Sequence, residues 1–338
     1  MRVLLGMSGG LDSTYAARLL LRAGHTVEGA VLIMHDYTEA DAARESAAAL
    51  GIPLHEIDCR ERFDREVVLP FCGDYRAAKT PNPCILCNER VKFAVLYEKM
   101  QEWGFDRIAT GHYARIGERD GRLSVLSAED GTKDQSYVLY RLPQEVLSHL
   151  LLPLGENTKS AVRSAAAREG LRAADRSESM EICFLPEGDH AAYITERFGP
   201  LPQGNFVDTE GRVLSPHRGI LHYTVGQRKG LGVALGERMF VTHIDPASGN
   251  ITLARDGERA VSSFSVERTV FSGISERDAG EENFLVKLRY LAPLLPCRVR
   301  FSPEGAEVML DTPVRTVTPG QSAVFYREDA VAFGGFIV

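Results

Sequence analysis

The first 110 residues alternate apolar runs with helical segments, and this alternation limits the fold more than any other feature of the chain. Strand-like runs occupy Arg2–Gly6, Thr26–Met34, Pro53–Ile57 and Arg107–Thr110, and helical spacing occupies Ser13–Ala23, Thr38–Leu50 and Asn88–Trp103. Strands separated by helices of this length build a parallel sheet that is covered on its faces. The sequence therefore predicts an α/β N-terminal domain with a Rossmann-like parallel sheet.

The rest of the chain has two different textures. Ala114–Ala128 contains two short polar-apolar alternations around Asp120-Gly121, which predict an antiparallel hairpin. Glycine and proline punctuate a loop-rich stretch after residue 196, and short strands follow at Phe284–Tyr290, Cys297–Phe301, Ala306–Leu310, Ser322–Tyr326 and Ala330–Ile337. We expect an N-terminal domain at 1–195, a small glycine-rich central domain at 196–258 that contacts RNA, and a C-terminal antiparallel β-barrel at 259–338.

Composition excludes several classes of protein. No apolar run approaches the roughly 18 residues of a membrane helix, and the N-terminus lacks the features of a signal peptide, so we expect a cytoplasmic protein without a membrane partner. Six cysteines in 338 residues are too few for a disulfide scaffold. The formal net charge of −7 argues against an indiscriminate nucleic-acid coat protein.

The segment Ser8-Gly9-Gly10-Leu11-Asp12-Ser13 follows a strand and opens a helix. Glycines there let the backbone approach an anion, and free N–H groups at the helix start attract it. The spacing fits neither the common P-loop nor the dinucleotide fingerprint. Asp12 beside phosphates would be repulsive without a cation between them, which points to ATP with Mg²⁺. The alternative is a strand-to-helix turn with a good N-cap.

This loop resembles the pyrophosphate-binding loop of the ATP-pyrophosphatase superfamily, whose members cleave ATP between the α and β phosphates and adenylate an oxygen. Seven further blocks are similar, in order, to the tRNA-specific 2-thiouridylase family, and together they cover nearly the whole chain. These blocks are Thr80–Asn88, Thr110–Arg115, Lys133–Tyr137, Glu181–Phe184, His222–Gly232, Arg289–Tyr290 and Thr318–Val324.

The resemblance implies a role for each matching residue. A persulfide on Cys183 would deliver sulfur, and Cys87 would attack it as nucleophile, releasing sulfide and leaving a transient disulfide. ATP contacts, with Asp12 also catalytic, would come from Gly6, Met7, Ser8, Gly9, Gly10, Leu11, Asp12, Ser13 and Gly111. On the second strand, counting favours Leu32 as a further ATP contact, whereas residue type favours Met34. Contacts to the target base or the tRNA would come from Asn82, Pro83, Cys84, His112, Lys133, Asp134, Gln135, Arg289, Tyr290 and Gln321.

Cys84 departs from the family pattern, which carries an aspartate three residues before the nucleophile. The resulting Cys84-x-x-Cys87 is by itself a weak signal for a zinc site or a redox pair, because no second Cys/His pair is present. Cys84, Cys87 and Cys183 could instead hold three irons of a [4Fe–4S] cluster whose open iron binds hydrosulfide. The sequence leaves this cluster route and the persulfide route open. Cys59, Cys72 and Cys297 are expected to be packing residues.

Two local stretches are basic in spite of the acidic total. Residues 76–92 carry a net +3 around the cysteine loop, and residues 211–230 carry +4. The second stretch interleaves its charges with His217, His222 and Tyr223, whose rings could stack on unpaired bases. The alternative for each stretch is a solvated basic loop.

The resemblance therefore implies an ATP-dependent tRNA-uridine 2-sulfurtransferase that adenylates O2 of the wobble uridine and replaces it with sulfur. Its partners would be the anticodon loops of tRNAs for lysine, glutamate and glutamine, and a sulfur donor protein or cysteine desulfurase. Two alternatives remain: a related thiolase acting at another RNA position, and a non-catalytic RNA-binding or iron–sulfur protein on the same scaffold.

Overall fold

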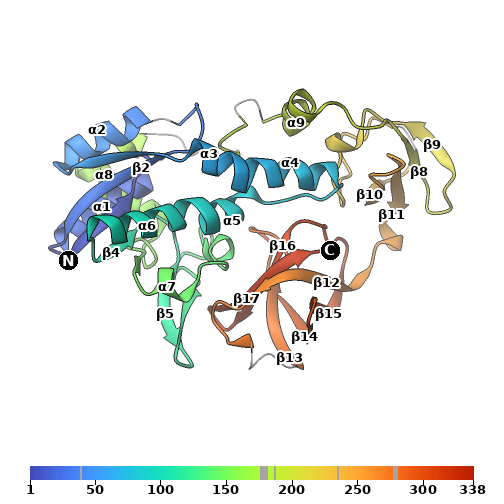
Figure 1. The fold of residues 1–338 in the computed structure, drawn as a ribbon. Coiled ribbons are helices and arrows are strands. Elements are labelled where there is room, and N and C mark those ends of the chain that lie inside the picture. The colour runs from blue at the N-terminus through green and yellow to red at the C-terminus, as the bar shows by residue number, and fades with distance from the viewer. Residues whose placement is uncertain (39, 176–181, 186–187, 234–235, 277–280) are drawn as a thin grey trace.

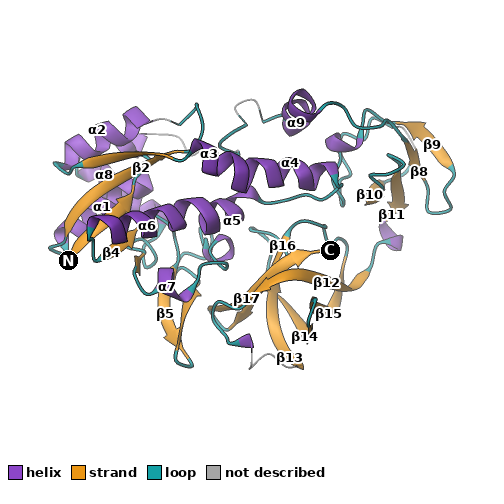
Figure 2. Cartoon of the chain, viewed as in Figure 1, coloured by secondary structure: helices purple, strands orange, loops and turns teal. Residues whose placement is uncertain are grey.

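A computed structural model describes residues 1–38, 40–175, 182–185, 188–233, 236–276 and 281–338 (Figure 1). Three structural regions follow one another along the chain, and Figure 2 distinguishes their helices from their strands by colour. Glu181, the first residue of one family block, lies outside the described residues.

The N-terminal domain contains a five-stranded parallel sheet in the order β3-β2-β1-β4-β7. Its strands are β1 (Arg2–Gly6), β2 (Thr26–Ile33), β3 (Leu54–Asp58), β4 (Arg107–Ala109) and β7 (Leu150–Leu151). The helices around it are α1 (Leu11–Arg22), α2 (Ala40–Leu50), α6 (Phe93–Trp103) and α8 (Lys159–Arg168). Val3, Leu4 and Leu5 of the central strand are fully buried, as a strand covered on both faces requires. The predicted Rossmann-like sheet is confirmed.

The strand order places the site. The chain runs from β1 outward through β2 to β3 and then returns to the other side of β1 with β4, so the order reverses between β1 and β4. In open parallel sheets, ligands bind beyond the carboxyl ends of the strands at such a reversal. The glycine loop follows β1 and Gly111 follows β4, so both lie at this point.

Two helical segments lie one after the other along the chain, separated by the loop at residues 77–82 (Figure 1). The first consists of α3 (Arg60–Phe63), a π-helical turn (Asp64–Val68) and α4 (Leu69–Arg76), and the second, which carries Cys84 and Cys87, consists of α5 (Pro83–Cys87), a second π-helical turn (Asn88–Lys92) and α6. Such π-turns inside helices occur frequently at functional sites. The second one corrects the uninterrupted α-helix that the sequence predicted over Asn88–Trp103.

The predicted hairpin is confirmed as β5 (Arg115–Arg119) and β6 (Arg122–Leu126). Asp120 and Gly121 both have positive φ, +50° and +75°, which a two-residue turn of type I′ requires. Leu126 pairs with Ala330, so this hairpin joins the sheet of the C-terminal domain.

The central region is less irregular than the sequence predicted. It holds α9 (His190–Phe198) and a four-stranded sheet in the order β10-β11-β8-β9. Its strands are β8 (Asn205–Val207), β9 (Val213–Pro216), β10 (Met239–Ile244) and β11 (Ile251–Arg255). Phe206, Ile251 and Leu253 are fully buried at its core, and they stabilise strands too short to stand out among the glycines.

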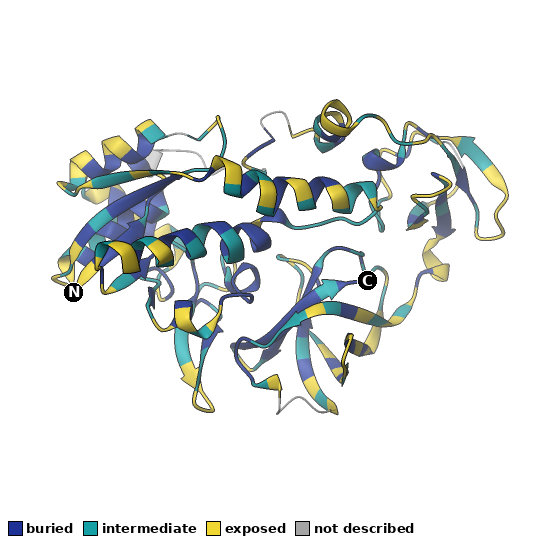
Figure 3. Ribbon diagram, in the orientation of Figure 1, coloured by how far each residue is buried: buried dark blue, intermediate teal, exposed yellow. Residues whose placement is uncertain are grey.

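The C-terminal strands close into the predicted antiparallel barrel. The order β12-β15-β14-β13-β16-β17 is completed by pairing of β12 with β17. The strands are β12 (Val261–Val270), β13 (Glu281–Lys287), β14 (Leu295–Ser302), β15 (Gly305–Val314), β16 (Ser322–Arg327) and β17 (Ala330–Ile337). Figure 3 shows the alternation of buried and exposed positions along these strands. The predicted strands omitted β12.

The remaining short elements are α7 (Gln144–Leu147) and 3-10 turns at Ser136–Val138, Arg172–Asp175, Ile220–His222 and Asp256–Glu258. No helix in the described ranges is both long enough and apolar enough to cross a bilayer.

Candidate active site

The glycine loop leads into a helix start that has no side-chain cap. Gly10 is the N-cap residue of α1, and no side chain caps this end, so the first N–H groups of the helix are available to an anion. The two serine hydroxyls brace the loop: Ser13 Oγ accepts from the Ser8 amide at 3.2 Å and lies 3.3 Å from Ser8 Oγ. The loop is therefore held in a shape that can surround phosphate oxygens.

Close backbone contacts explain two of the glycines. A Cβ on Gly9 would lie 2.2 Å from a backbone carbon of Ala42 in α2, and Gly9 has φ +76°. A Cβ on Gly111 would lie 2.7 Å from the backbone carbon of Asp12. The loop after β4 thus packs directly on the glycine loop, which places Gly111 beside the proposed ATP contacts.

Asp12 is paired with a lysine that sequence reasoning missed. Lys159 Nζ lies 2.7 Å from each carboxylate oxygen of Asp12, and Tyr113 donates its hydroxyl to the same carboxylate at 2.8 Å. The Lys159 side chain is only 12% exposed. The sequence interpretation placed Mg²⁺ beside Asp12 to balance its negative charge. In the structure, the ammonium group of Lys159 provides part of that positive charge.

The sequence around Lys159 did contain a signal. Thr158 caps α8 by accepting from the Ala161 amide, which makes Lys159 the first residue of that helix. A cation in the first helical turn opposes the helix dipole. Such an unfavourable placement indicates that the charge has another partner, and here that partner is Asp12.

The residues at this loop also fit a magnesium ion. Mg²⁺ in nucleotide sites is typically held by one or two carboxylates together with phosphate oxygens. Asp12 is a carboxylate in the first turn of α1, beside the available N–H groups. Asp12 could therefore contribute the protein oxygen of such a site while Lys159 shares its charge.

The CxxC segment forms the short helix α5. Pro83 occupies its first position, and Asn82 Oδ1 accepts from the Cys84 amide at 3.1 Å as the N-cap. Cys84 is exposed, whereas Cys87 faces inward, where its Sγ lies 3.7 Å from Met34 Sδ. The two cysteines therefore differ in access to solvent although they share one helix.

Tertiary structure brings Cys183 to the same place. Ile182, Phe184 and Leu185, which flank it, pack on the apolar cluster that contains Cys87. The Cys183 residue itself is exposed. A negative charge on Cys183 acts on Cys87 across this contact, so the two thiols are electrostatic neighbours.

Loss of water contacts disfavours the thiolate form of all three thiols. Burial raises the pKa of Cys87 to about 12, and a charge on Cys84 or Cys183 raises it further. Solvent reaches Cys84 and Cys183, yet the surrounding protein displaces enough water to raise the pKa of each. Thiolate formation therefore needs a nearby positive charge.

Lys92 supplies that charge. It is the last residue of the π-turn that begins after Cys87, so it stands one turn along the helix from the thiol. The charge of Lys92 lowers the pKa of Cys84, Cys87 and Cys183 against the larger effect of burial. The sequence interpretation had placed Lys92 in a basic stretch for RNA phosphates.

The cysteine arrangement does not fit a metal cluster. Within the described residues, which include Cys84, Cys87 and Cys183, no three Cys, His, Asp or Glu side chains are grouped so that they could hold a metal ion. A [4Fe–4S] cluster with three protein ligands requires such a group. The proposed roles of the cysteines below are therefore derived without a cluster.

Leu32 lies in β2 and Met34 follows the last residue of that strand. Both side chains pack on the apolar cluster that contains Cys87. Leu32 is buried, and its side chain belongs to the cluster around Cys87. Met34 is half-buried and touches Cys87 through its sulfur. The structure does not decide between the two as the expected ATP contact, since both side chains pack on the cluster around Cys87.

Two of the residues that the resemblance matched to tRNA contacts, Asp134 and Gln135, form hydrogen bonds within the protein. The Asp134 carboxylate is buried and accepts from the Ala128 and Ser136 amides and from Lys287 Nζ. Gln135 Oε1 accepts from the Tyr113 amide at 2.8 Å. Gln135 thus supports the loop after β4, and Asp134 is bonded to the hairpin end, to Ser136 and to β13, so both side chains have partners within the protein.

His112 is a neutral, half-buried side chain in this structure. Burial lowers its pKa well below the ordinary value, and the charge of Lys92 lowers it further. Its Nδ1 lies 2.8 Å from Thr110 Oγ1, and its ring packs 5.5 Å from that of Phe93. His112 therefore lies in the cysteine site and shares its charged neighbour.

The barrel contributes Arg289, Tyr290 and Gln321. Arg289 is exposed and donates to Thr318 Oγ1. Tyr290 packs 6.3 Å, centroid to centroid, from Tyr137. Gln321 donates its side-chain amide to the carbonyl of Thr80, at 2.6 Å.

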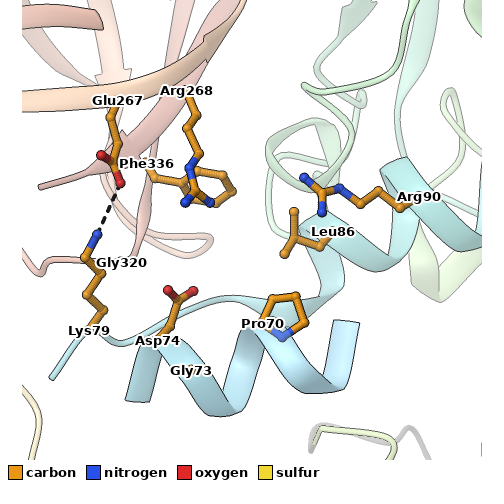
Figure 4. Close-up of a pocket in the computed structure, with 10 residues that line it drawn as sticks. All are labelled: Pro70, Gly73, Asp74, Lys79, Leu86, Arg90, Glu267, Arg268, Gly320 and Phe336. Carbon is orange, nitrogen blue, oxygen red and sulfur yellow. Dashed lines mark hydrogen bonds and ion pairs between the residues drawn. The ribbon is translucent and has the colours of Figure 1, made fainter. Parts of the chain in front are cut away.

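The first basic stretch, residues 76–92, borders a charged cavity. Lys79, Arg90 and Arg268 line this cavity of about 300 Å³ between α4, α5 and the barrel, together with Asp74 and Glu267 (Figure 4). Lys79 pairs with Glu267 at 3.1 Å, and Arg90 lies 3.4 Å from Glu66. Much of this positive charge is thus neutralised by nearby acids.

The ring stacking suggested for the second basic stretch, residues 211–230, is corrected by the structure. His217 and Tyr223 are buried against Phe206 in the central core, and His217 is fixed by hydrogen bonds to the backbone at Gly219 and Gly249. Arg228 and Lys229 are exposed. The charges of this stretch can reach RNA, but these two rings cannot stack on its bases.

Comparison with known proteins covers the whole chain. Residues 1–187 match a family described as a tRNA methyl transferase HUP domain, residues 191–255 a tRNA methyl transferase PRC-barrel domain, and residues 261–337 an aminomethyltransferase beta-barrel domain. These three segments correspond in order to the parallel sheet, the central sheet and the barrel.

Relatives of full length are named for thiolation. The chain is 40% identical to the tRNA-specific 2-thiouridylase MnmA of Clostridium perfringens, over 99% of this chain and 98% of that protein. It is 40% identical to the protein of the same name from Syntrophotalea carbinolica, over 99% and 98% of the two chains. The relative from Desulforudis audaxviator is 41% identical, again over 99% and 98%.

Proposed function

Because this chain belongs to the tRNA-specific 2-thiouridylase family, we propose that it converts the wobble uridine of tRNA to 2-thiouridine with ATP and the sulfur chemistry of Cys87 and Cys183. One observation carries the residue assignment. The fold brings the segment of Cys183 onto the cluster around Cys87, beside the strand ends where the glycine loop lies. This arrangement supports a site in which the glycine loop binds the nucleotide and the two thiols transfer sulfur.

The glycine loop and its neighbours would perform the adenylation. The available N–H groups of α1 and the hydroxyls of Ser8 and Ser13 bind the pyrophosphate of ATP, and Lys159 offsets charge as pyrophosphate leaves. The uridine O2 attacks the α-phosphorus, and pyrophosphate departs. Mg²⁺, bound by the phosphates and Asp12, would supply further charge neutralisation.

The cysteines would then deliver sulfur. The Cys87 thiolate attacks the Cys183 sulfur of a Cys183–S–SH persulfide, forming a Cys87–Cys183 disulfide and expelling hydrosulfide. Hydrosulfide adds to C2 of the adenylated uridine, and AMP leaves. An external dithiol reduces the disulfide, and a donor restores the sulfane sulfur on Cys183. Because burial disfavours thiolates here, Lys92 is assigned to stabilise them.

The other partners, the location and the domain boundaries are proposed from the same family resemblance. We propose a sulfur carrier protein or cysteine desulfurase as the donor, tRNAs for lysine, glutamate and glutamine as acceptors, and a cytoplasmic location. We also propose division of the chain at 195/196 and 258/259.

A direct assay tests this function. Purified protein, unmodified tRNA, ATP and a persulfide donor should yield 2-thiouridine at the wobble position, with AMP and pyrophosphate in equal amounts, measured by nucleoside mass spectrometry. Modification at another position would support a different RNA thiolase. Tight tRNA binding without AMP release would contradict the enzyme and support a binding protein.

Changing Cys84 to aspartate tests which sulfur route operates. We expect thiolation to remain within about threefold of wild type, because the persulfide exchange needs only Cys87 and Cys183. The wild-type protein, purified without oxygen, should contain no stoichiometric iron or acid-labile sulfide, and neither should the variant. Loss of thiolation together with loss of bound iron would contradict the persulfide route.

Changing Lys92 to methionine tests the electrostatic assignment. Lys92 lowers the pKa of Cys84 and Cys183, so its removal should move the pH midpoint of iodoacetamide alkylation at both exposed thiols upward. At pH 8, alkylation should slow by about threefold or more. Site-resolved peptide mass spectrometry across pH 6–10 measures the shift, and an unchanged midpoint would remove Lys92 from the site.

A further inference from the structure

A tight turn of the C-terminal barrel holds the loop that leads into the cysteine helix. The Thr80 amide donates to the Pro319 carbonyl at 2.8 Å, and Gln321 Nε2 donates to the Thr80 carbonyl at 2.6 Å. Both backbone groups of Thr80 are therefore bonded to residues far away in sequence. Thr80 stands just before Asn82, which caps α5, so this attachment lies next to the thiol helix.

Packing shows how close the two segments are. A Cβ on Gly320 would lie 2.7 Å from the Thr80 nitrogen and 2.8 Å from Lys79 Cβ, and Gly320 has φ +86°. Any other residue would therefore push the two segments apart. The Lys79–Glu267 ion pair beside this contact is partly exposed, so it adds little (Figure 4).

The turn itself is anchored in the barrel. The Gly320 amide donates to the Ile337 carbonyl, and the Ile337 amide donates to the Gln321 carbonyl, at 2.9 and 2.8 Å. Thr318 is buried and accepts from Arg289. The 318–321 turn is thus bonded within the barrel, and both backbone hydrogen bonds of Thr80 run to it.

The orientation of the Gln321 amide is fixed by chemistry. A backbone carbonyl only accepts, so the side-chain nitrogen must face Thr80. A carboxylate at position 321 would place an acceptor against an acceptor. The family resemblance matches Gln321 to a tRNA contact, but in this structure its amide serves the protein.

We propose that Gln321 is a positioning residue. Through its hydrogen bond to the Thr80 carbonyl, it fixes the segment Thr80–Cys87, which includes α5, in its position relative to the nucleotide site. This inference rests on the proposed thiolation. Since Cys87 must meet both Cys183 and the activated uridine, a displaced loop slows sulfur transfer even when tRNA is bound. The barrel thus acts in catalysis at a distance from the thiols.

Gln321→Glu and Gln321→Ala in the full-length protein test the inference. Without tRNA, alkylation of the buried Cys87 should rise about threefold or more, because the loop opens more often. At saturating tRNA, kcat for thiolation should fall about tenfold or more. Gln203→Ala, an exposed glutamine of the central region, should change neither quantity.

The readouts separate the competing roles. A weaker tRNA affinity with unchanged kcat and unchanged Cys87 alkylation would make Gln321 an RNA contact only and overturn the proposal. Faster alkylation with unchanged kcat would also overturn it, because loop position would then not matter for turnover. If the wild type made no 2-thiouridine, the proposed function would fail, but the tRNA-free alkylation arm would still report on the loop.

Discussion

Replacing Cys87 or Cys183 by serine is expected to reduce 2-thiouridine formation to background while ATP binding persists. Serine cannot carry a sulfane sulfur or form the disulfide that expels hydrosulfide, whereas the glycine loop lies on separate elements. Nucleoside mass spectrometry of tRNA after a fixed reaction time measures the loss. AMP release in the first turnover should survive, because adenylation precedes sulfur transfer.

Cys72→Ser is the matched control for packing. Cys72 is 1% exposed and belongs to the same apolar cluster as Cys87, but no role in sulfur transfer is assigned to it. If Cys72→Ser folds with normal thermal stability and abolishes thiolation equally, the loss reflects cluster packing and the nucleophile assignment is wrong. Retained thiolation in Cys183→Ser would remove Cys183 as the carrier.

Replacing Lys159 by methionine should lower AMP and pyrophosphate release by about 100-fold or more. Removal of one preorganised charge at a transition state typically costs that much, and here it also leaves the Asp12 carboxylate beside the phosphates without its ion-pair partner. Pyrophosphate release with saturating tRNA and Mg²⁺ measures the effect. Lys159→Arg, which keeps the charge, should retain more activity than Lys159→Met.

The controls for Lys159 address charge and folding. Lys99→Met removes a lysine that pairs with Glu102 on α6, away from the loop, and should leave pyrophosphate release unchanged. Wild-type rates in Lys159→Met at every Mg²⁺ concentration would show that Mg²⁺ alone neutralises the pyrophosphate. Recovery only at high Mg²⁺ would support charge sharing between the ion and the lysine.

The descriptions of the matched domains and the names of the full-length relatives imply different reactions. The matched domains are described as methyl transferases, whereas the relatives are named thiouridylases. The relatives named thiouridylases match 99% of this chain, so their name is the more specific of the two. The cysteines that meet here favour thiolation, which the assay above tests directly.

Local sequence patterns were sufficient for most of the fold. The strand and helix periodicities predicted the parallel sheet, the Asp120-Gly121 hairpin and the C-terminal barrel, because each of these depends on short-range alternation and turn chemistry. The π-turn after Cys87 was not predictable, since its residues are as compatible with an ordinary α-helix. The strands of the central region were not predicted, because their apolar stretches are short and the many glycines around them are typical of loops.

The site divides in the same way. The sequence alone predicted the glycine loop and its helix start and, through the family resemblance, the two cysteines proposed to react, because these reside in contiguous motifs. Only the tertiary structure decided which distant groups meet them: Lys159 at Asp12, Cys183 at Cys87 and Gln321 at Thr80. The physical reason is that charge pairing, thiol proximity and backbone capping are contacts through space, and neither spacing nor composition records which segments the fold brings together.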